Sequence, residues 1–248
     1  MKEIVAGDIR FQMIGPDISQ GPLPTIFYFA VTALETLTVE PFAQALLGLD
    51  LTRLRVMSVS TPGHHEPGAY HEAIGKWVSS YKEGNDQLGI FFERVAAGIE
   101  DLAKRGYLLS HQVALMGLSR GALVATHIAL RLPFVAPVVG FAPMIALSQT
   151  QEGLKQNLKE CSHDLIHHVD ALVKLPITYY VGNRDMLINS QAVVNLILKV
   201  ADRAHALGGR QLPYELHLFP SIGYKGHGTP LEVFRTGSER LGEMLHGK

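Results

Sequence analysis

Short apolar runs alternate with longer stretches of helical periodicity along the whole of this 248-residue sequence. The runs predict strands at residues 25–31, 54–60, 113–118, 135–141, 177–181 and 214–219, and a hairpin or edge pair at 4–14. The central runs carry almost no polar residues, as strands covered on both faces require. The alternation therefore predicts an α/β fold with a doubly wound, mostly parallel sheet, and the length fits one domain over residues 1–248.

Helical spacing of apolar residues fills the segments between these runs. It predicts helices at residues 39–47, 87–105, 120–130, 165–172, 190–207 and 230–245. In the second of them Leu88, Phe92, Val95 and Ile99 share one face, which is typical of packing against a sheet. The sequence thus supplies helices for both faces of the predicted sheet.

Residues 142–170 interrupt this alternation. They follow a predicted strand, yet they carry little strand character and include the polar stretch 149–152. Insertions at the carboxyl ends of strands cover the ligand crevice in folds of this kind. We therefore predict a small lid of one or two helices at 142–170, and a long surface connection is the alternative.

The charge balance argues against a polyanionic partner. The formal net charge is −1, and the Lys and Arg residues are scattered without forming a basic stripe. We expect no nucleic acid and a neutral small molecule as the partner. The sequence leaves the oligomeric state open.

Cysteine content and hydropathy indicate the compartment. Cys161 is the single cysteine, so no internal disulfide can form, and charged residues interrupt the first fourteen positions, where a secretory peptide would need an apolar stretch. No window approaches the roughly 20 apolar residues that span a bilayer. We expect a cytoplasmic protein without a membrane span.

The pentapeptide Gly117-Leu118-Ser119-Arg120-Gly121 joins the apolar run 113–118 to the predicted helix 120–130. A strand, a sharp turn and a helix are the setting of a nucleophile elbow, in which a strained central residue lifts its hydroxyl above the sheet. Glycines on either side spare such a crowded turn a Cβ clash. Ser119 is therefore the candidate nucleophile.

A serine hydroxyl needs a base within hydrogen-bond reach and an acid that orients the base. Asp185 follows the strand 177–181 in the sequence Gly-Asn-Arg-Asp, which places a carboxylate at a strand's carboxyl end. His227 lies between two glycines in the loop after the last predicted strand. We identify Asp185 as the candidate orienting acid and His227 as the candidate general base and acid.

The elbow and the chain order Ser119, Asp185, His227 resemble the α/β-hydrolase superfamily over essentially the whole chain, with an outline similar to carboxylesterases and small serine hydrolases. The resemblance implies these three residues as nucleophile, acid and base. It says little about the substrate, because related hydrolases share this machinery and differ in their pockets.

An oxyanion hole needs two donors near the nucleophile. The backbone N–H of Arg120, at a helix N-terminus, is one candidate. The second is expected after the strand 25–31, where the superfamily often carries a His-Gly pair and this chain does not. Thr32, with its neighbour Ala33, is the predicted source. Leu118 and His64 are candidate pocket residues, His64 because 61–65 resembles a Pro-Gly-His loop found near such active sites, although a structural turn is the alternative.

The sequence gives no positive signal for a metal or cofactor. His163 and His167 lie one helical turn apart, and His64, His65 and His71 cluster, but neither group comes with an HExxH pattern or paired cysteines. No GxGxxG or GxxxxGK[ST] pattern occurs. We predict no metal and no cofactor.

These observations predict a serine hydrolase, carboxylesterase-like, that cleaves a small or medium acyl ester through an acyl-enzyme intermediate. A thioesterase or peptidase with the same residues is the nearest alternative. The alternative of another class is a hydrolase-like binding protein without turnover, motivated by the absent His-Gly pair.

Overall fold

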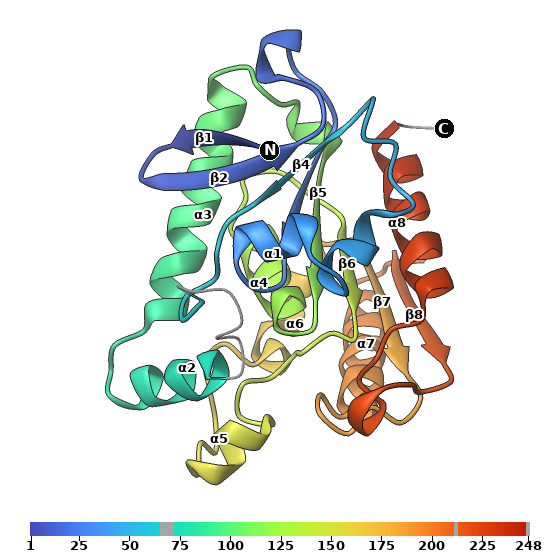
Figure 1. The fold of residues 1–248 in the computed structure, drawn as a ribbon. Coiled ribbons are helices and arrows are strands. Elements are labelled where there is room, and N and C mark those ends of the chain that lie inside the picture. Colours follow the sequence, from blue (N-terminus) through green and yellow to red (C-terminus); the bar gives the residue numbers. More distant parts are fainter. Residues whose placement is uncertain (65–71, 211–212, 247–248) are drawn as a thin grey trace.

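The computed structural model describes residues 1–64, 72–210 and 213–246 (Figure 1). Eight strands form one sheet in the order β1-β2-β4-β3-β5-β6-β7-β8. The first two form an antiparallel hairpin, β2 runs antiparallel to β4, and the other neighbours are parallel. The strands are β1 Lys2–Ala6, β2 Ile9–Ile14, β3 Thr25–Phe29, β4 Arg55–Ser58, β5 Val113–Leu118, β6 Val138–Phe141, β7 Ile177–Gly182 and β8 Tyr214–Phe219.

Helices cover both faces of the sheet, which confirms the doubly wound α/β fold (Figure 1). The α-helices are α1 Ala33–Thr38, α2 Ala73–Lys82, α3 Gln87–Lys104, α4 Arg120–Ala129, α5 Gln151–Lys155, α6 Val169–Leu172, α7 Ser190–Ala206 and α8 Leu231–His246. Single 3₁₀ turns occur at η1 Ile18–Gln20, η2 Phe42–Leu46, η4 Ser110–Gln112, η5 Leu165–His168 and η6 Tyr224–Gly226. Within the described ranges no helix is both long and apolar enough to cross a membrane.

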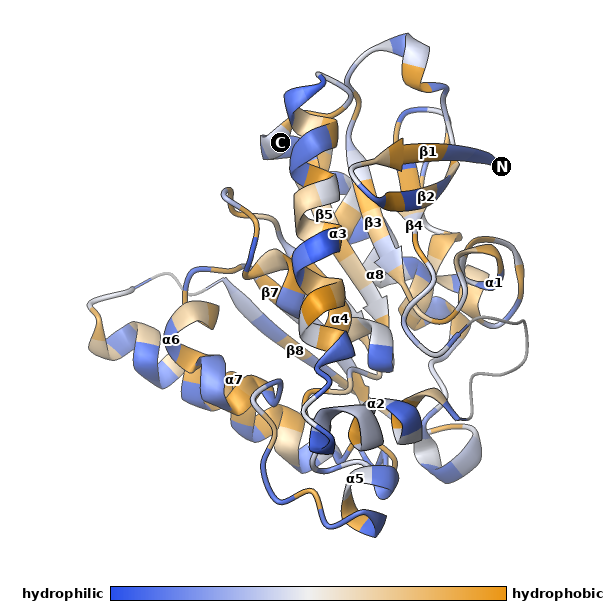
Figure 2. Cartoon of the chain, turned by 90° about the vertical axis from the view of Figure 1, so that its left-hand side faces the viewer, coloured by the Kyte–Doolittle hydropathy of each residue, from blue (hydrophilic) through white to orange (hydrophobic). Residues whose placement is uncertain are grey.

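The core lies in two layers, one on each face of the sheet. All five residues of β3 are buried, and they alternate: Phe27 and Phe29 join the layer under α3, α4 and α7, whereas Ile26 and Tyr28 join the layer under α1 and α8. This is the burial expected of a strand covered on both faces. Apolar and polar residues alternate along α3 and α7 in Figure 2, in keeping with helices that cover a sheet.

The predicted helix at 39–47 is wrong. A helix begins earlier, at Ala33, because the Thr32 hydroxyl accepts the Glu35 N–H and caps it. It ends before Val39, and the 3₁₀ turn η2 follows Pro41. Proline has no backbone N–H and disfavours helical geometry in the residue before it, so no continuous helix passes through this position.

Three further differences concern boundaries and a missed helix. The strand predicted at 135–141 begins only at Val138, directly after Pro137, which cannot donate to a strand ladder. Helix α2 was not predicted, although it buries Trp77 and Val78 in the core. The predicted helix at 165–172 is divided into η5 and the short α6.

Arg55 of β4 is a fully buried cation that holds the N-terminal region to the sheet. Its guanidinium donates to four backbone carbonyls: those of Pro16, Asp17 and Gly21 in the connection between β2 and β3, and that of Tyr107 after α3. The rigid fork of an arginine reaches separate acceptors that a single ammonium cannot.

We expect Arg55→Lys to lower the free energy of unfolding by about 3 kcal/mol or more, because several buried carbonyls lose their donor. Urea unfolding measures this change, and Arg53→Lys at an exposed neighbouring position is the matched control with an effect within about 0.5 kcal/mol. A loss below about 1 kcal/mol at Arg55 would contradict the assignment.

Candidate active site

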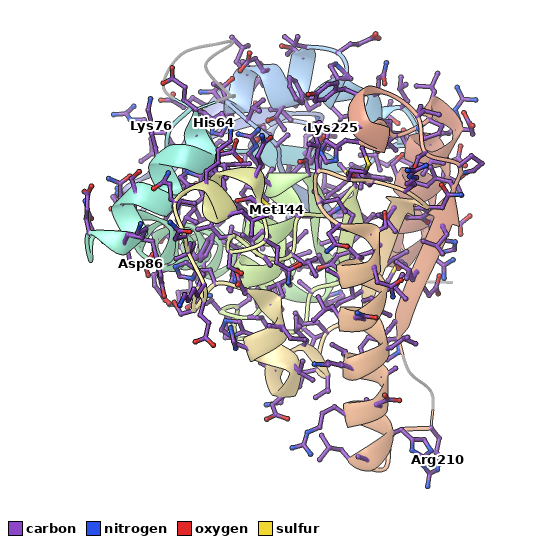
Figure 3. The ribbon with its side chains drawn as sticks, turned by 90° about the horizontal axis from the view of Figure 1, so that it is seen from below. His64, Lys76, Asp86, Met144, Arg210 and Lys225 are labelled. Atoms are coloured by element: carbon purple, nitrogen blue, oxygen red, sulfur yellow. The ribbon has the colours of Figure 1, made fainter. Side chains whose placement is uncertain are left out.

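The parallel strands deliver the candidate residues to one edge of the sheet. Ser119 follows β5, Asp185 lies three residues after β7, and His227 is in the loop after β8. Seen from below in Figure 3, His64, Met144 and Lys225 share this face, and they come from the loops that follow β4, β6 and β8. The carboxyl ends of these strands therefore meet on one side of the molecule, where ligands bind in open α/β sheets.

Ser119 has the strained backbone of a nucleophile elbow. Its backbone angles, a φ of 54° and a ψ of −118°, lie in a region that residues other than glycine rarely adopt. The two flanking glycines permit the tight turn: a Cβ at Gly121 would lie 1.8 Å from the Phe29 carbonyl oxygen, and one at Gly117 would lie 2.3 Å from the Ala122 nitrogen. The sequence pattern thus folds as predicted.

The Ser119 hydroxyl lies within hydrogen-bond distance of His227. The Ser119 Oγ to His227 Nε2 distance is 2.8 Å, and His227 Nδ1 lies 2.6 Å from Asp185 Oδ2. An ionised carboxylate only accepts hydrogen bonds, so Nδ1 carries the proton and donates to Asp185. Nε2 then accepts from the serine hydroxyl, which is the arrangement that general-base activation requires.

Asp185 is held in place by further bonds. Its side chain is almost fully buried, and Oδ1 accepts the N–H groups of Leu187 and Ile188 at 3.0 and 3.2 Å. The Asp185 N–H donates to the Ser190 hydroxyl, which in turn donates to the Gly182 carbonyl. Sequence analysis missed Ser190, which sits at the start of α7.

The loop that carries His227 is tied to the loop that carries Asp185. The Met186 N–H donates to the Lys225 carbonyl at 3.0 Å. Gly226 has a φ of +79°, and a Cβ there would lie 2.3 Å from the Arg184 carbonyl oxygen. The glycine before the histidine is therefore required for the two loops to approach closely enough for the Asp-His contact.

A cavity of about 490 Å³ opens over Ser119 and His227. Segments from both halves of the chain line it, including Thr150, Gln151 and Glu152 from the region of α5. Its larger apolar lining residues include Phe42, Ile74, Leu118, Met144, Leu187, Ile188 and Phe234. The cavity suits an apolar group placed next to the serine. Of the two candidate pocket residues, Leu118 lies in this lining.

The expected second oxyanion donors require a correction. The part of the loop after β3 that lines the cavity is Ala30 and Val31, not Thr32 and Ala33. Ala33 is the first residue of α1, and its N–H donates to the Ser60 hydroxyl at 3.0 Å. The Ala33 N–H is therefore engaged outside the cavity, and Thr32, the cap of this helix, is not in the lining. Arg120, the other candidate donor, is in the lining as the first residue of α4.

His64 lies behind the cavity and not in its lining. It is 1% exposed, and its Nε2 lies 3.2 Å from NH1 of Arg120, which is in the lining. Its Nδ1 is 2.8 Å from the Thr61 hydroxyl, and its ring packs edge-on against Trp77. Burial and the Arg120 guanidinium lower the pKa of His64 to about 4.

A second buried histidine, His127 of α4, is stacked on Phe92, and burial lowers its pKa well below the ordinary value. An unfolded chain protonates its histidines near pH 6.5, whereas the folded chain keeps these two neutral to lower pH. We therefore expect the free energy of unfolding to fall as the pH drops from about 6.5 toward 4, by on the order of 3 kcal/mol for His64 alone.

Urea unfolding between pH 7 and 4.5 measures this loss. His64→Gln removes one titrating group, so the decline with pH becomes shallower, whereas His205→Gln at an exposed position of α7 leaves it unchanged. An equal decline in all three proteins would contradict a buried, neutral His64.

The remaining histidines form no recognisable metal centre where the structure describes them. His163 Nε2 pairs with Asp86 Oδ1 at 2.6 Å, and the His127 ring donates to the His163 carbonyl. No group of three or more His, Cys, Asp or Glu side chains that could hold a metal ion is found among the described residues. His65 and His71 lie outside those residues.

Solved structures resemble this chain along most of its length. TT1662 from Thermus thermophilus matches at a TM-score of 0.69 with 15% identity, covering 100% of this chain and 98% of that one. The esterase Pf2001 from Pyrococcus furiosus matches at 0.64 with 17% identity, covering 99% and 90%. A puromycin-hydrolyzing peptidase from Mycobacterium tuberculosis matches at 0.61 with 14% identity, covering 94% of this chain and 37% of its own.

No family model and no curated protein sequence matches the chain. At these identities the structural likeness establishes the fold alone: the chain has the α/β-hydrolase fold, as predicted from its elbow and from the chain order of Ser119, Asp185 and His227.

Proposed function

We propose that this protein is a serine hydrolase that transfers an acyl group from an ester to water, with Ser119 as nucleophile, His227 as general base and acid, and Asp185 as orienting acid. The observation that carries the proposal is the unbroken chain from the Ser119 hydroxyl through the His227 ring to the buried Asp185 carboxylate. Structural neighbours that are esterases and peptidases support the same reaction class.

The reaction would begin when Ser119 Oγ attacks the acyl carbonyl while His227 Nε2 takes the hydroxyl proton. The imidazolium, held by Asp185, gives that proton to the leaving alkoxide as the carbon–oxygen bond breaks. Water then enters, loses a proton to Nε2 and attacks the acyl-enzyme. Release of the carboxylic acid returns the proton to Ser119 and restores the starting state.

The oxyanion that forms at each attack needs nearby donors. We assign one to the Arg120 N–H, because it directly follows Ser119 in the first turn of α4, where the amides have no acceptor within the helix. We assign the other to the loop after β3, part of which lines the cavity. The Val31 N–H itself is not the donor, because it already donates to the buried Thr36 hydroxyl at 3.1 Å. A backbone donor does not depend on the absent His-Gly pair.

The acyl group would occupy the apolar cavity, whose size fits a small or medium chain. We further propose that residues 142–170 act as its lid, because they contribute Met144 and the first turn of α5 to the lining. Gln156, just after α5, accepts a hydrogen bond from the Ser79 hydroxyl and donates to the Gly75 carbonyl, both in α2. These bonds attach the lid to α2, which lies beside it (Figure 1).

A substrate screen tests the ester assignment. The butyryl p-nitrophenyl ester, butyryl thioester and butyryl p-nitroanilide share one acyl group and differ in the atom that leaves. We expect the largest kcat/KM for the oxygen ester. A preference for the thioester or the anilide would replace the esterase with a thioesterase or a peptidase of the same fold.

A binding protein without turnover is the alternative from another class. Labelling with a fluorophosphonate, followed by mass spectrometry of the modified peptide, distinguishes the two. Stoichiometric modification of Ser119 supports the hydrolase, and the absence of modification in folded protein would favour the binding protein.

A further inference from the structure

The side chain of Arg120 is connected to the loop after β3 by a buried chain of hydrogen bonds. Arg120 NH1 lies 3.2 Å from His64 Nε2, and His64 Nδ1 lies 2.8 Å from Thr61 Oγ1. The Thr61 hydroxyl and backbone N–H both donate to the Val31 carbonyl, at 3.4 and 3.2 Å. The chain therefore runs from the residue after the nucleophile to the loop after β3, which also contributes to the cavity lining.

The chemistry of the two ends fixes the direction of every bond in this chain. A guanidinium has donors only, so His64 Nε2 must be unprotonated and accept from Arg120. The proton of the neutral ring then lies on Nδ1 and donates to the Thr61 oxygen. The Thr61 hydroxyl proton points to the Val31 carbonyl. One tautomer of one neutral histidine satisfies all the contacts.

The surroundings of His64 favour this neutral, fixed state. His64 and Thr61 are each 1% exposed, and the Trp77 indole N–H holds their loop through the Pro62 carbonyl at 2.7 Å. The positive Arg120 acts against protonation of the ring and outweighs the opposing influence of the negative Glu35. If His64 were protonated, its Nε2–H would face the Arg120 NH1, and two hydrogen-bond donors would oppose each other.

We propose that His64 is a positioning residue for the reaction at Ser119: its neutral ring ties Arg120 to the loop after β3 through the Val31 carbonyl, and thereby holds the two segments to which we assign the oxyanion donors at a fixed separation. This inference rests on the proposed function. Neither His64 nor Thr61 lines the cavity, so neither contacts the substrate. Their contribution reaches the reacting atoms through the placement of Arg120 and Val31.

Two substitutions of Thr61 provide the sharpest test. Thr61→Val keeps the shape of the side chain and removes the hydroxyl, whereas Thr61→Ser keeps the hydroxyl. His64→Leu removes both ring contacts. Each protein is assayed with p-nitrophenyl butyrate, and the rate is divided by the concentration of Ser119 that a fluorophosphonate titrates. This division corrects for any fraction of a variant that fails to fold.

We expect Thr61→Val and His64→Leu to lower the titrated kcat by roughly tenfold to a hundredfold with KM within about twofold, because misplaced oxyanion donors weaken binding of the transition state more than binding of the substrate. Thr61→Ser should retain the parental kcat within about threefold. A residue with only a structural role would change the titratable fraction and leave the titrated kcat unaltered.

The outcomes separate this inference from the proposed function. Suppose that the parent is labelled and turns over, and that Thr61→Val and His64→Leu both keep the parental kcat. The positioning role of His64 would then be overturned, and the proposed function would stand. A parent that is folded but neither labelled nor active would overturn both.

Discussion

Ser119→Ala is expected to lower kcat for an activated ester by at least about 10³-fold while leaving the fold intact. The hydroxyl is the only group of this site that we assign to covalent attack, and the remaining oxyanion donors support only residual catalysis. Alanine adopts the same strained backbone as serine, so the free energy of unfolding should change by less than about 1 kcal/mol. Steady-state hydrolysis and urea unfolding measure the two quantities.

The double variant Ser119→Ala/His227→Ala sharpens this test. Groups that act as one unit have non-additive effects, so the double variant should be about as slow as the single ones. Ser110→Ala, at an exposed position in η4, is the control and should retain full activity. A Ser119→Ala protein with more than about a tenth of the parental kcat would exclude Ser119 as the nucleophile.

Gly121→Ala should destabilise the folded protein by more than about 4 kcal/mol or prevent folding. The added methyl would lie 1.8 Å from the Phe29 carbonyl oxygen and 3.0 Å from the Ala30 nitrogen, and both are backbone atoms of the central sheet and the cavity loop. These atoms cannot move unless β3 separates from α4, and overpacking of this kind is among the costliest substitutions.

Gly75→Ala in α2 is the matched control. The nearest atom to a Cβ there is the Glu152 Cγ at 3.9 Å, so the methyl fits. Because alanine favours a helix interior over glycine, this variant should gain about 0.5–1 kcal/mol. Urea unfolding of both variants measures the difference, and a Gly121→Ala protein of parental stability would refute the close approach of α4 to β3.

The parts of this fold that follow from the sequence are those with strong local patterns. The strands β5 and β8 begin and end at the predicted residues, because a continuous apolar run in β5 and an alternating apolar and polar run in β8 end at turn residues. The convergence of Ser119, Asp185 and His227 was also predictable, since parallel strands place their carboxyl ends at one edge. Their catalytic roles stay a prediction.

The parts that sequence analysis missed depend on contacts between distant segments. The cap that starts α1 at Ala33 has a local signature, the capping-box pattern Thr32-Ala-Leu-Glu35, which the sequence analysis did not use. That Thr32 then lies outside the cavity lining is visible only in the structure. His64 drew attention as a pocket residue, yet its burial behind Arg120 is set by Trp77 of the unpredicted helix α2. The packing around His64 has no local signature that periodicity or spacing could reveal.

The order of the strands divides the site between the two halves of the chain. Ser119, Asp185 and His227 all follow strands of the half from β5 to β8, whereas Val31, Phe42 and other lining residues come from the half before it. Directed evolution can exploit this division. A mutagenesis library confined to the lining positions 42 and 74, which both precede β5, would vary which acyl group is accepted while the residues that move protons stay untouched.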